Sequence, residues 1–275
     1  MTWVIKIGGS VRDPEPVLRD IAATVAASHE QIVVVHGASR ALNDLSERLG
    51  YPPRMVESGR GDVSRYTDST TMDHFLMAYA GVTNKRIVER LRQLGVDAFG
   101  LCGLDGGLAT GRRRADIRIV ANGRTRILHD NHAGSIERVQ APVLQTLLDR
   151  GCTPVVTPPI AAEDGTAINV DGDRLAAEVA IALHADRLFF FADTPGVLHD
   201  AGDQASSIRE MTADNCDASS FSGRVRPKLQ AAARAVMRGV DSVVIASGVT
   251  GAPLQQALRG EATHIVAASA ANSSS

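Results

Sequence analysis

Two lysines and one aspartate in the sequence stand where they could neutralise a bound anion. Lys6 lies inside the short apolar run IKIGGS, and Lys228 precedes an apolar helical pattern in GRVRPKL. Burying an ammonium group without a partner costs free energy, so a lysine inside an apolar strand indicates that its charge is used. Only three of the 29 basic residues are lysines, the third being Lys85, and the other 26 are arginines. These lysines are therefore candidates for sites that need a compact ammonium group rather than a planar guanidinium.

Each of the first two apolar runs ends in a small-residue turn that could hold phosphate. Gly8 and Gly9 follow the first run, and Gly37 and Ala38 follow the second, in VVVHGAS. Glycine lets the backbone approach a ligand closely, and successive N–H groups in such a turn form an anion cradle. Neither turn has the GxxxxGK or GxGxxG pattern, so the sequence carries no P-loop or dinucleotide fingerprint. His36 is a candidate base, although a packed, hydrogen-bonded turn histidine is the commoner arrangement.

An acidic cluster precedes another helical pattern. In NVDGD, the polar residues Asn169, Asp171 and Asp173 alternate, which predicts that they share one side of an extended segment entering a helix. Acidic residues in a first helical turn commonly cap the helix, and here they could instead hold a metal-bound nucleotide or a lysine. Two lysines, two glycine turns and this cluster together indicate phosphoryl transfer, whose chemistry depends on positioning and charge neutralisation.

The order of apolar patterns predicts the elements that carry these residues. Short apolar runs bounded by Gly, Pro or Asp are typical of buried parallel strands, and longer helical stretches alternate with them. This order predicts an α/β fold with a mainly parallel sheet and helices on both faces. The expected strands are residues 2–7, 31–35, 98–101, 153–156, 187–191 and 241–246, and the expected helices are residues 17–28, 41–49, 69–94, 142–150, 174–183 and 229–238.

Two turn-rich segments and one boundary interrupt this alternation. Residues 50–66 and 107–132 are polar and too long for minimal connections, so we expect hairpins or lids beside a site. A soft boundary in TPPIAAEDG (residues 157–165) divides a single domain, residues 1–268, into two lobes that share one sheet. The low-complexity end, residues 269–275, is expected to be a disordered tail.

Composition and charge exclude several classes of protein. The 275 residues are 44% hydrophobic and 22% charged, as in an ordinary globular domain, and no apolar run approaches the roughly 18 residues of a membrane span. Three widely spaced cysteines exclude a disulfide framework, and no leader peptide is visible, so we expect a cytoplasmic protein that binds no membrane. A formal net charge of −2 and an aromatic content of 4% argue against nucleic-acid binding.

Six segments, in this order and spacing, resemble the amino-acid kinase family: IKIGGS, VVVHGAS, SRYTD, NVDGD, FFADTPGV and GRVRPKL. They span nearly the whole chain. The resemblance implies a three-layer αβα sandwich around a mainly parallel sheet, with about residues 1–165 binding the carboxylate substrate and about residues 166–268 binding ATP. It further implies ATP-dependent phosphorylation of a side-chain carboxylate. Mg²⁺ would be held mostly by phosphate oxygens and water, so no side chain is assigned to a metal.

The family's functional roles carry over onto the matching positions of this sequence. Lys6 and Lys228 would contact the transferring phosphoryl group, and Asp173 would hold both lysines in place. Gly8 and Gly9 would donate backbone N–H groups to the phosphates. The remaining roles are ATP binding by Asp193, Thr194, Gly196 and Val197, and substrate binding by Gly37, Ala38, Arg65 and Asn169, with Arg65 paired to a carboxylate. Ala38 stands where acetylglutamate kinases have a second glycine, so its N–H is available to a ligand if its φ is negative.

Within the family, GLCGLDGGL, AYAGVTNK, TPVVTPPIA and an arginine-rich segment are similar to the LysW-aminoadipate kinases, a branch sister to the N-acetylglutamate kinases. This similarity implies a substrate of aminoadipate or glutamate attached to an acidic LysW-type carrier protein, in lysine or arginine biosynthesis. One alternative is a kinase of free N-acetylglutamate in arginine biosynthesis. Another is a nucleotide-binding regulator without catalysis, against which the intact Lys6, Asp173 and Lys228 count. An unusual amino acid on the carrier also stays open.

The arginine-rich segment supplies a physical reason for a carrier-linked substrate. Residues 111–126 contain six arginines and one acid, Asp116, a local charge of +5 on a chain of −2. Such a run is commonly a solvated face, but on a hairpin beside the substrate it would steer an acidic protein. We therefore expect Arg112, Arg113 and Arg114 to dock the carrier. The resemblance also implies a homodimer or a higher homo-oligomer, and we expect it to form through the stretch 69–94, whose apolar residues exceed one narrow stripe.

Overall fold

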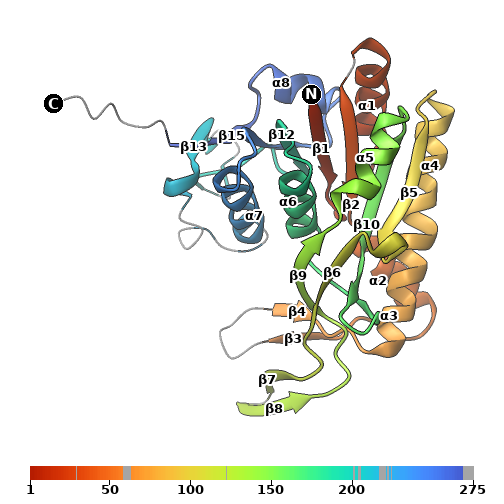
Figure 1. Ribbon diagram of the computed structural model, residues 1–275. Helices are drawn as coiled ribbons and strands as arrows, with labels where there is room; N and C mark the ends of the chain where they lie inside the picture. The colour runs from red at the N-terminus through yellow and green to blue at the C-terminus, as the bar shows by residue number, and fades with distance from the viewer. Residues whose placement is uncertain are drawn as a thin grey trace.

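A single mainly parallel sheet organises the protein (Figure 1). The structure is a computed structural model that describes residues 1–28, 30–57, 63–121, 123–200, 202–203, 206–216, 221, 223 and 225–268. The strand order is β13-β15-β14-β12-β1-β2-β10-β6-β9, with β5 and β11 also paired to β10. These strands are β1 Thr2–Ile7, β2 Gln31–His36, β5 Ala98–Gly103, β6 Ala109–Arg113, β9 Gly134–Val139, β10 Thr153–Ala162, β11 Ala167–Ile168, β12 Arg187–Ala192, β13 Glu210–Thr212, β14 Ser242–Ser247 and β15 Thr263–Val266.

Helices cover both faces of this sheet, which confirms the predicted three-layer α/β architecture. One face packs against α1 (Glu15–Ala27), α4 (Asn84–Gln93) and α8 (Pro253–Leu258). The opposite face packs against α5 (Ala141–Asp149), α6 (Gly172–Ala182) and α7 (Val225–Met237). Two further helices, α2 (Ser39–Arg48) and α3 (Ser69–Leu76), form a separate apolar cluster beside the sheet.

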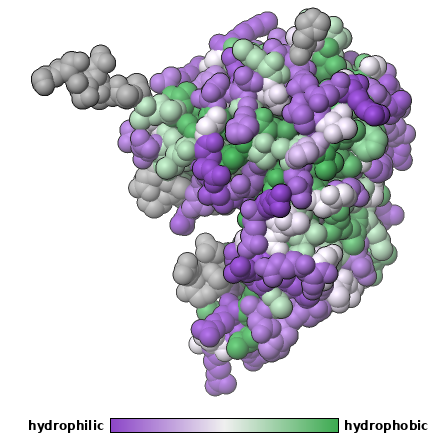
Figure 2. Space-filling model, viewed as in Figure 1, coloured by the Kyte–Doolittle hydropathy of each residue, from purple (hydrophilic) through white to green (hydrophobic). Residues whose placement is uncertain are grey.

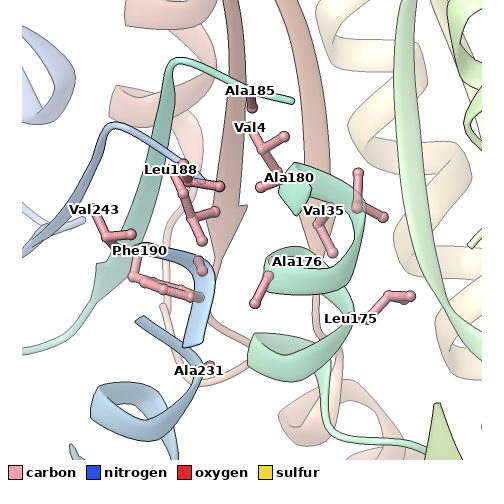
Figure 3. Close-up of a cluster of buried hydrophobic side chains, with 14 of the residues drawn as sticks. Val4, Val35, Leu175, Ala176, Ala180, Ala185, Leu188, Phe190, Ala231 and Val243 are labelled. Carbon is pink, nitrogen blue, oxygen red and sulfur yellow. The ribbon is translucent and has the colours of Figure 1, made fainter. Parts of the chain in front are cut away.

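Alternation along the strands decides which side chains reach the site. In β1, Trp3, Ile5 and Ile7 belong to the core under α1 and α8, whereas Val4 belongs to the core under α6 and α7. Figure 3 shows Val4 in this second core, between the strands and α6. Because successive side chains point to opposite faces of a sheet, Lys6 follows Val4 onto the α6 and α7 side. The apolar pattern of β1 therefore places its one charged side chain against those two helices.

Two hairpins project from the sheet, as Figure 1 shows. They are β3 (Met55–Glu57) with β4 (Val63–Arg65), and β7 (Ile117–Ala121) with β8 (Arg124–Leu128). Val56, Tyr66 and Ile119 pack together and join the hairpins to each other. Figure 2 shows a hollow between this mainly hydrophilic projection and the body of the molecule. The prediction of hairpins in residues 50–66 and 107–132 is thus confirmed, although residues 109–113 form β6 of the main sheet instead.

Other expected elements differ in extent. The single helix expected over residues 69–94 contains a π-helical segment, Met77–Thr83, between α3 and α4. The expected boundary at residues 157–165 falls partly within the long strand β10, so the chain continues through it in one sheet. In the part of the chain that the structure describes, no helix is long and apolar enough to cross a membrane. The tail expected at residues 269–275 lies outside the described residues.

Candidate active site

A cavity of about 960 Å³ lies at the carboxyl ends of β1, β2 and β12, three adjacent parallel strands. Open α/β sheets bind ligands at this edge, because the strands end there in loops and helix N-termini. The sequence-predicted residues that line the cavity are Lys6, Gly8, Gly9, Gly37, Asp173, Asp193, Thr194, Gly196 and Lys228. Residues from both ends of the sequence therefore meet in one site.

The two predicted lysines share one carboxylate. Lys6 Nζ lies 2.5 Å from Asp173 Oδ1, and Lys228 Nζ lies 2.8 Å from Asp173 Oδ2. All three residues are at most 9% exposed. Lys228 Nζ also lies 4.9 Å from the centroid of the buried Phe190 ring, a cation–π contact. Asp173 thus fixes two ammonium groups, from β1 and α7, on one side of the cavity.

The cluster itself carries more positive than negative charge. Burial opposes ionisation of Asp173, but the charges of Lys6 and Lys228 outweigh it and hold the pKa of Asp173 well below its ordinary value. Burial lowers the pKa of Lys228, and the carboxylate of Asp173 opposes that shift. Two ammonium groups around one carboxylate carry a net charge of +1 where water is largely excluded. This charge suits an anionic ligand or an anionic transition state.

The acidic segment reaches the site in a different conformation from the one expected. Asp171 is the N-cap of α6, and its side chain accepts a hydrogen bond from the backbone N–H of Arg174. Asp173 is therefore in the first helical turn rather than on an extended segment. Asn169 turns toward Thr67, to whose Oγ1 it donates a hydrogen bond at 3.1 Å, and does not line the cavity. Lys228 likewise lies inside α7, which begins at Val225 rather than at residue 229.

The two glycine turns pack backbone against backbone. A Cβ atom at Gly9 would lie 2.8 Å from Ala38 N and 2.7 Å from Ser39 N, closer than side chains approach. A Cβ atom at Gly37 would lie 3.0 Å from Gly9 N. Glycine is therefore required at Gly9 for the loops after β1 and β2 to meet, and a side chain at Gly37 would fit only if the neighbouring backbone moved slightly. Ala38 has a φ of −146°, the negative value that the substitution of glycine by alanine needs.

Four predicted site residues do not line the cavity. Val197 is fully buried, and its backbone N–H donates to Thr263 Oγ1. Ala38 is 3% exposed, and Asn169 faces Thr67. Arg65 lies farther out, where its Nη2 donates to Asn43 Oδ1 at 2.5 Å and its Nη1 is buried with no hydrogen-bond partner among the described residues. Burial lowers the pKa of this guanidinium. A half-buried cation with a donor that has no partner among the described residues is suited to an anionic ligand group.

His36 is a packing residue rather than a base. Its Nδ1 lies 3.3 Å from the carbonyl oxygen of Gly37, and its Nε2 lies 3.1 Å from Asn84 Nδ2. A neutral ring that donates from Nδ1 and accepts at Nε2 satisfies both contacts. Burial, partly offset by the hydrogen bond to Gly37 and reinforced by the charge of Lys6, lowers the pKa of His36 to about 4.

This buried histidine makes folding sensitive to acid. Between its ordinary pKa of 6.5 and about 4, the unfolded chain binds a proton at this position that the folded chain excludes. The contribution of the neutral His36 to the free energy of unfolding is therefore fully present above pH 6.5. About 3 kcal/mol of that free energy is lost as the pH falls from 6.5 to 4. Urea unfolding of the wild type and His36→Gln at several pH values measures this, and the stability gap between the two is expected to narrow as the pH falls.

The matched control is His184→Asn, which removes an exposed histidine whose φ of +49° asparagine tolerates. Its stability difference from the wild type is expected to change little over the same range. A gap between wild type and His36→Gln that stays constant from pH 7 to pH 4 would contradict a neutral, buried His36.

Comparison with known proteins agrees with this geometry. A model of the amino acid kinase family matches residues 1–247. The chain belongs to the amino acid kinase family. This confirms the resemblance found in the six segments and the fold that it implies.

Two relatives cover almost the whole of this amino acid kinase. The [LysW]-aminoadipate kinase of Deinococcus radiodurans is 43% identical over 94% of this chain and 90% of its own length. The [LysW]-aminoadipate kinase of Thermus thermophilus is 38% identical over 94% of this chain and 98% of its own. Among solved structures, an N-acetylglutamate synthase from Neisseria gonorrhoeae has a TM-score of 0.78 at 23% identity, covering 98% of this chain and 60% of the other. That structural likeness concerns the fold alone.

Sequence reasoning missed several residues of the cavity wall. These are Ser10, Ser39, Tyr79, Leu198, His199, Asp200 and Phe221, among others. Tyr79 is one of the apolar residues of the stretch 69–94 that exceed one narrow stripe, and we interpreted these residues as a dimer surface. Instead, Phe75 and Tyr79 are buried and stacked on each other, while Met77 and Val82 are exposed. Within the described residues no group of three or more His, Cys, Asp or Glu side chains could hold a metal ion.

The predicted docking arginines do not form the hairpin cluster that the sequence suggested. Arg112 and Arg113 end β6 in the main sheet, and Arg114 follows them. Arg112 Nε lies 3.3 Å from Glu137 Oε1, and Arg113 Nη2 lies 3.3 Å from Asp130 Oδ1. The hairpin of β7 and β8 carries Arg118, Arg124 and Arg126 instead. Acidic residues from outside the arginine-rich segment therefore offset part of the local charge of +5.

Proposed function

We propose that this protein is an ATP-dependent kinase for the side-chain carboxylate of aminoadipate or glutamate attached to an acidic, LysW-type carrier protein. The product is an acyl phosphate in lysine or arginine biosynthesis. The observation that carries the proposal is the Lys6–Asp173–Lys228 cluster, buried at the cavity wall with a net positive charge. Relatives named [LysW]-aminoadipate kinase over nearly the full chain support the choice of substrate.

The chemistry needs positioning and charge, not a protein base. A carboxylate oxygen of the substrate forms a bond to the γ-phosphorus of ATP, and the bond from that phosphorus to the β–γ bridging oxygen breaks. ADP leaves with the bonding electrons. The attacking carboxylate is already deprotonated, so no proton has to be removed, which agrees with a neutral His36 that lies outside the cavity wall. Lys6 and Lys228 neutralise charge on the transferring group, and Asp173 keeps both ammonium groups in position.

The rest of the site is divided between the two substrates. In this proposal, residues 1–165 hold the carboxylate substrate and residues 166–268 hold ATP, within one domain. Backbone N–H groups of the turn at Gly8 and Gly9 receive the phosphates. Asp193, Thr194 and Gly196, in the loop after β12, border the nucleotide, with Val197 packed behind them. Mg²⁺ bound with ATP would supply further charge neutralisation, and phosphate oxygens and water would hold it. The carboxylates of Asp171, Asp193 and Asp200 are scattered along the wall, an arrangement that fits a metal ion held in this way.

In this proposal, the carboxylate of the substrate that is not phosphorylated lies at the outer end of the site, together with the carrier protein. Arg65 Nη1, which has no hydrogen-bond partner among the described residues, is a donor for a carboxylate, and we assign Gly37, Ala38 and Asn169 to the same substrate. Farther out, we assign carrier docking to Arg112, Arg113 and Arg114, beside the hairpin arginines. A homodimer through the helical segment at residues 69–94, where Met77 and Val82 are 50% and 61% exposed, is part of the same proposal.

Trapping of the acyl phosphate with hydroxylamine tests the function directly. The enzyme with Mg-ATP is given free N-acetylglutamate in one reaction, and aminoadipate or glutamate linked to an acidic carrier protein in two others. We expect hydroxamate only from the carrier-linked substrates. Turnover of N-acetylglutamate would instead make this a kinase of the free amino acid, and no turnover of any carboxylate would refute the kinase assignment.

Carrier docking predicts a salt-dependent effect of the arginines. Replacement of Arg112, Arg113 and Arg114 by serine is expected to raise KM for the carrier-linked substrate by about tenfold or more at low salt, because electrostatic steering is lost. The KM of ATP should not change. The response of KM to added NaCl should also weaken relative to wild type. Steady-state kinetics from 25 to 500 mM NaCl, where the Debye length falls from roughly 20 to roughly 4 Å, measure both effects.

A second triple variant controls for the loss of charge itself. Arg150, Arg238 and Arg259 are exposed and lie outside both hairpins, so their replacement by serine removes the same charge from other parts of the surface. Kinetics of that variant should resemble those of wild type. Equal KM values for the two triple variants would contradict a docking role for residues 112–114.

A further inference from the structure

Tyr79 lines the cavity from an unusual position in the chain. It lies in the π-helical segment Met77–Thr83, and its ring stacks on Phe75 at a centroid distance of 3.8 Å and an interplanar angle of 10°. A π-helical turn shifts the following residues around the helix and is frequent at functional sites. The stacking fixes the ring, because it removes the freedom of the side chain to turn away. Tyr79 is therefore held rigidly in the cavity wall.

The hydroxyl group of Tyr79 donates no hydrogen bond to the residues that the structure describes, so its proton is available to a ligand in the cavity. Burial raises the pKa of Tyr79, so the hydroxyl keeps its proton at neutral pH. The nearby backbone N–H of Ala38 acts to lower the pKa of this hydroxyl, but by less than burial raises it. A protonated phenol can donate that proton to an anion.

Arg65 lies near enough to Tyr79 for its charge to act there, but it is not part of the cavity wall. Arg65 Nη2 is held by Asn43, and Arg65 Nη1 is buried without a partner among the described residues. Tyr79 in the cavity wall and the nearby Arg65 therefore offer two neighbouring groups to an anion at this end of the site.

We propose that Tyr79 contacts the carboxylate substrate: its hydroxyl donates to the carboxylate that Arg65 neutralises, and its ring forms the wall against the aliphatic arm. The inference rests on the proposed function and assigns this residue a role in substrate specificity. A hydrogen bond to a charged group contributes more than one between neutral groups, so loss of the hydroxyl alone should be measurable. Loss of the ring should also change the preference of the pocket between aminoadipate and glutamate, whose side chains differ in length.

The test compares Tyr79→Phe with Tyr79→Leu. Tyr79→Phe keeps the ring and its stacking on Phe75, and we expect KM for carrier-linked aminoadipate to rise about tenfold or more, with KM for ATP unchanged. We expect Tyr79→Leu to raise KM further and to change the ratio of kcat/KM between carrier-linked aminoadipate and glutamate. Tyr51→Phe is the matched control, because it removes a hydroxyl that bonds to Asp68 outside the cavity wall. Thermal unfolding checks that each variant is folded.

Different outcomes separate this inference from the proposed function. Wild-type kinetics in Tyr79→Phe, with an active wild type, would overturn the role of Tyr79 and leave the kinase assignment standing. If the wild type does not phosphorylate the carrier-linked substrates, calorimetric titration with carrier-linked aminoadipate decides. A dissociation constant about tenfold weaker in Tyr79→Phe than in wild type supports the contact even then. Equal binding, or no binding by the wild type, overturns it.

Discussion

Lys6→Ala and Lys228→Ala are each expected to lower kcat by about 10² to 10³ or more, with small changes in KM. Both ammonium groups lie in the cavity wall on opposite oxygens of Asp173, where they can neutralise charge that develops during transfer. An interaction made mainly in the transition state lowers kcat and kcat/KM together when it is removed. Steady-state kinetics with saturating Mg-ATP and carrier-linked substrate measure this.

The chain offers its own control, since it has only one other lysine. Lys85 is exposed and donates to Asn84 Oδ1 and to the carbonyl oxygen of Gly100, away from the cavity. Lys85→Ala should keep near-normal kcat. Either active-site substitution leaves Asp173 one lysine partner, so the fold should be retained. A Lys228→Ala enzyme with near-normal kcat would refute the two-lysine mechanism.

Arg65→Ala is expected to raise KM for the carboxylate substrate by about 10²-fold and to leave KM for ATP unchanged. The Arg65 guanidinium is half-buried, Asn43 holds one of its nitrogens, and another has no partner in the part of the chain that the structure describes, so a substrate carboxylate would lose its principal cation. Removal of one partner from a desolvated charge pair costs about 2–5 kcal/mol, which corresponds to a change of this order. We expect little rescue from Arg65→Lys, because lysine lacks the fork of the guanidinium.

Arg54→Ala is the companion measurement. Arg54 lies before the same hairpin, and its guanidinium packs over the Tyr66 ring at 5.2 Å from the centroid rather than near the cavity. Its removal should affect stability slightly and KM hardly at all. An Arg65→Ala enzyme whose KM for ATP rises while that for the carboxylate substrate stays constant would place Arg65 at the nucleotide instead.

The central strands could be predicted from the sequence because burial on both faces leaves a continuous apolar run. Thr2–Ile7 was predicted with its exact bounds, and 187–191 within one residue of β12. The edge strands β9 and β13, and β6 next to β9, lacked that signal, because few of their residues are buried and polar residues interrupt them. Strong apolar periodicity thus located the layers, and the sheet edges became visible only through pairing with distant strands.

The same contrast holds within the site. Lys6 and Lys228 could be found because a charge in an apolar segment is costly, and Gly8, Gly9 and Gly37 because their spacing repeats after two strands. The conformation around Asp173 could not be predicted, since alternating acids fit an extended strand and a capped helix equally well. The partners of Arg112 and Arg113 lie in other segments, so a local charge count overestimated the free charge. Tyr79 was hidden by its ordinary apolar surroundings.

The position of β1 in the middle of the sheet has a consequence for how the polypeptide folds as it is made. β1 lies between β2 and β12, and Trp3 is in register with both Ile32 and Arg187. A nascent chain that ends before residue 187 leaves one edge of an apolar strand without hydrogen-bond partners, a state prone to pair with other chains. The last third of the polypeptide must therefore emerge before the first strand is protected. An expressed fragment that stops near residue 165 should aggregate or recruit chaperones. When it is produced together with the rest of the chain as a second fragment, which carries β12, the two should complement each other.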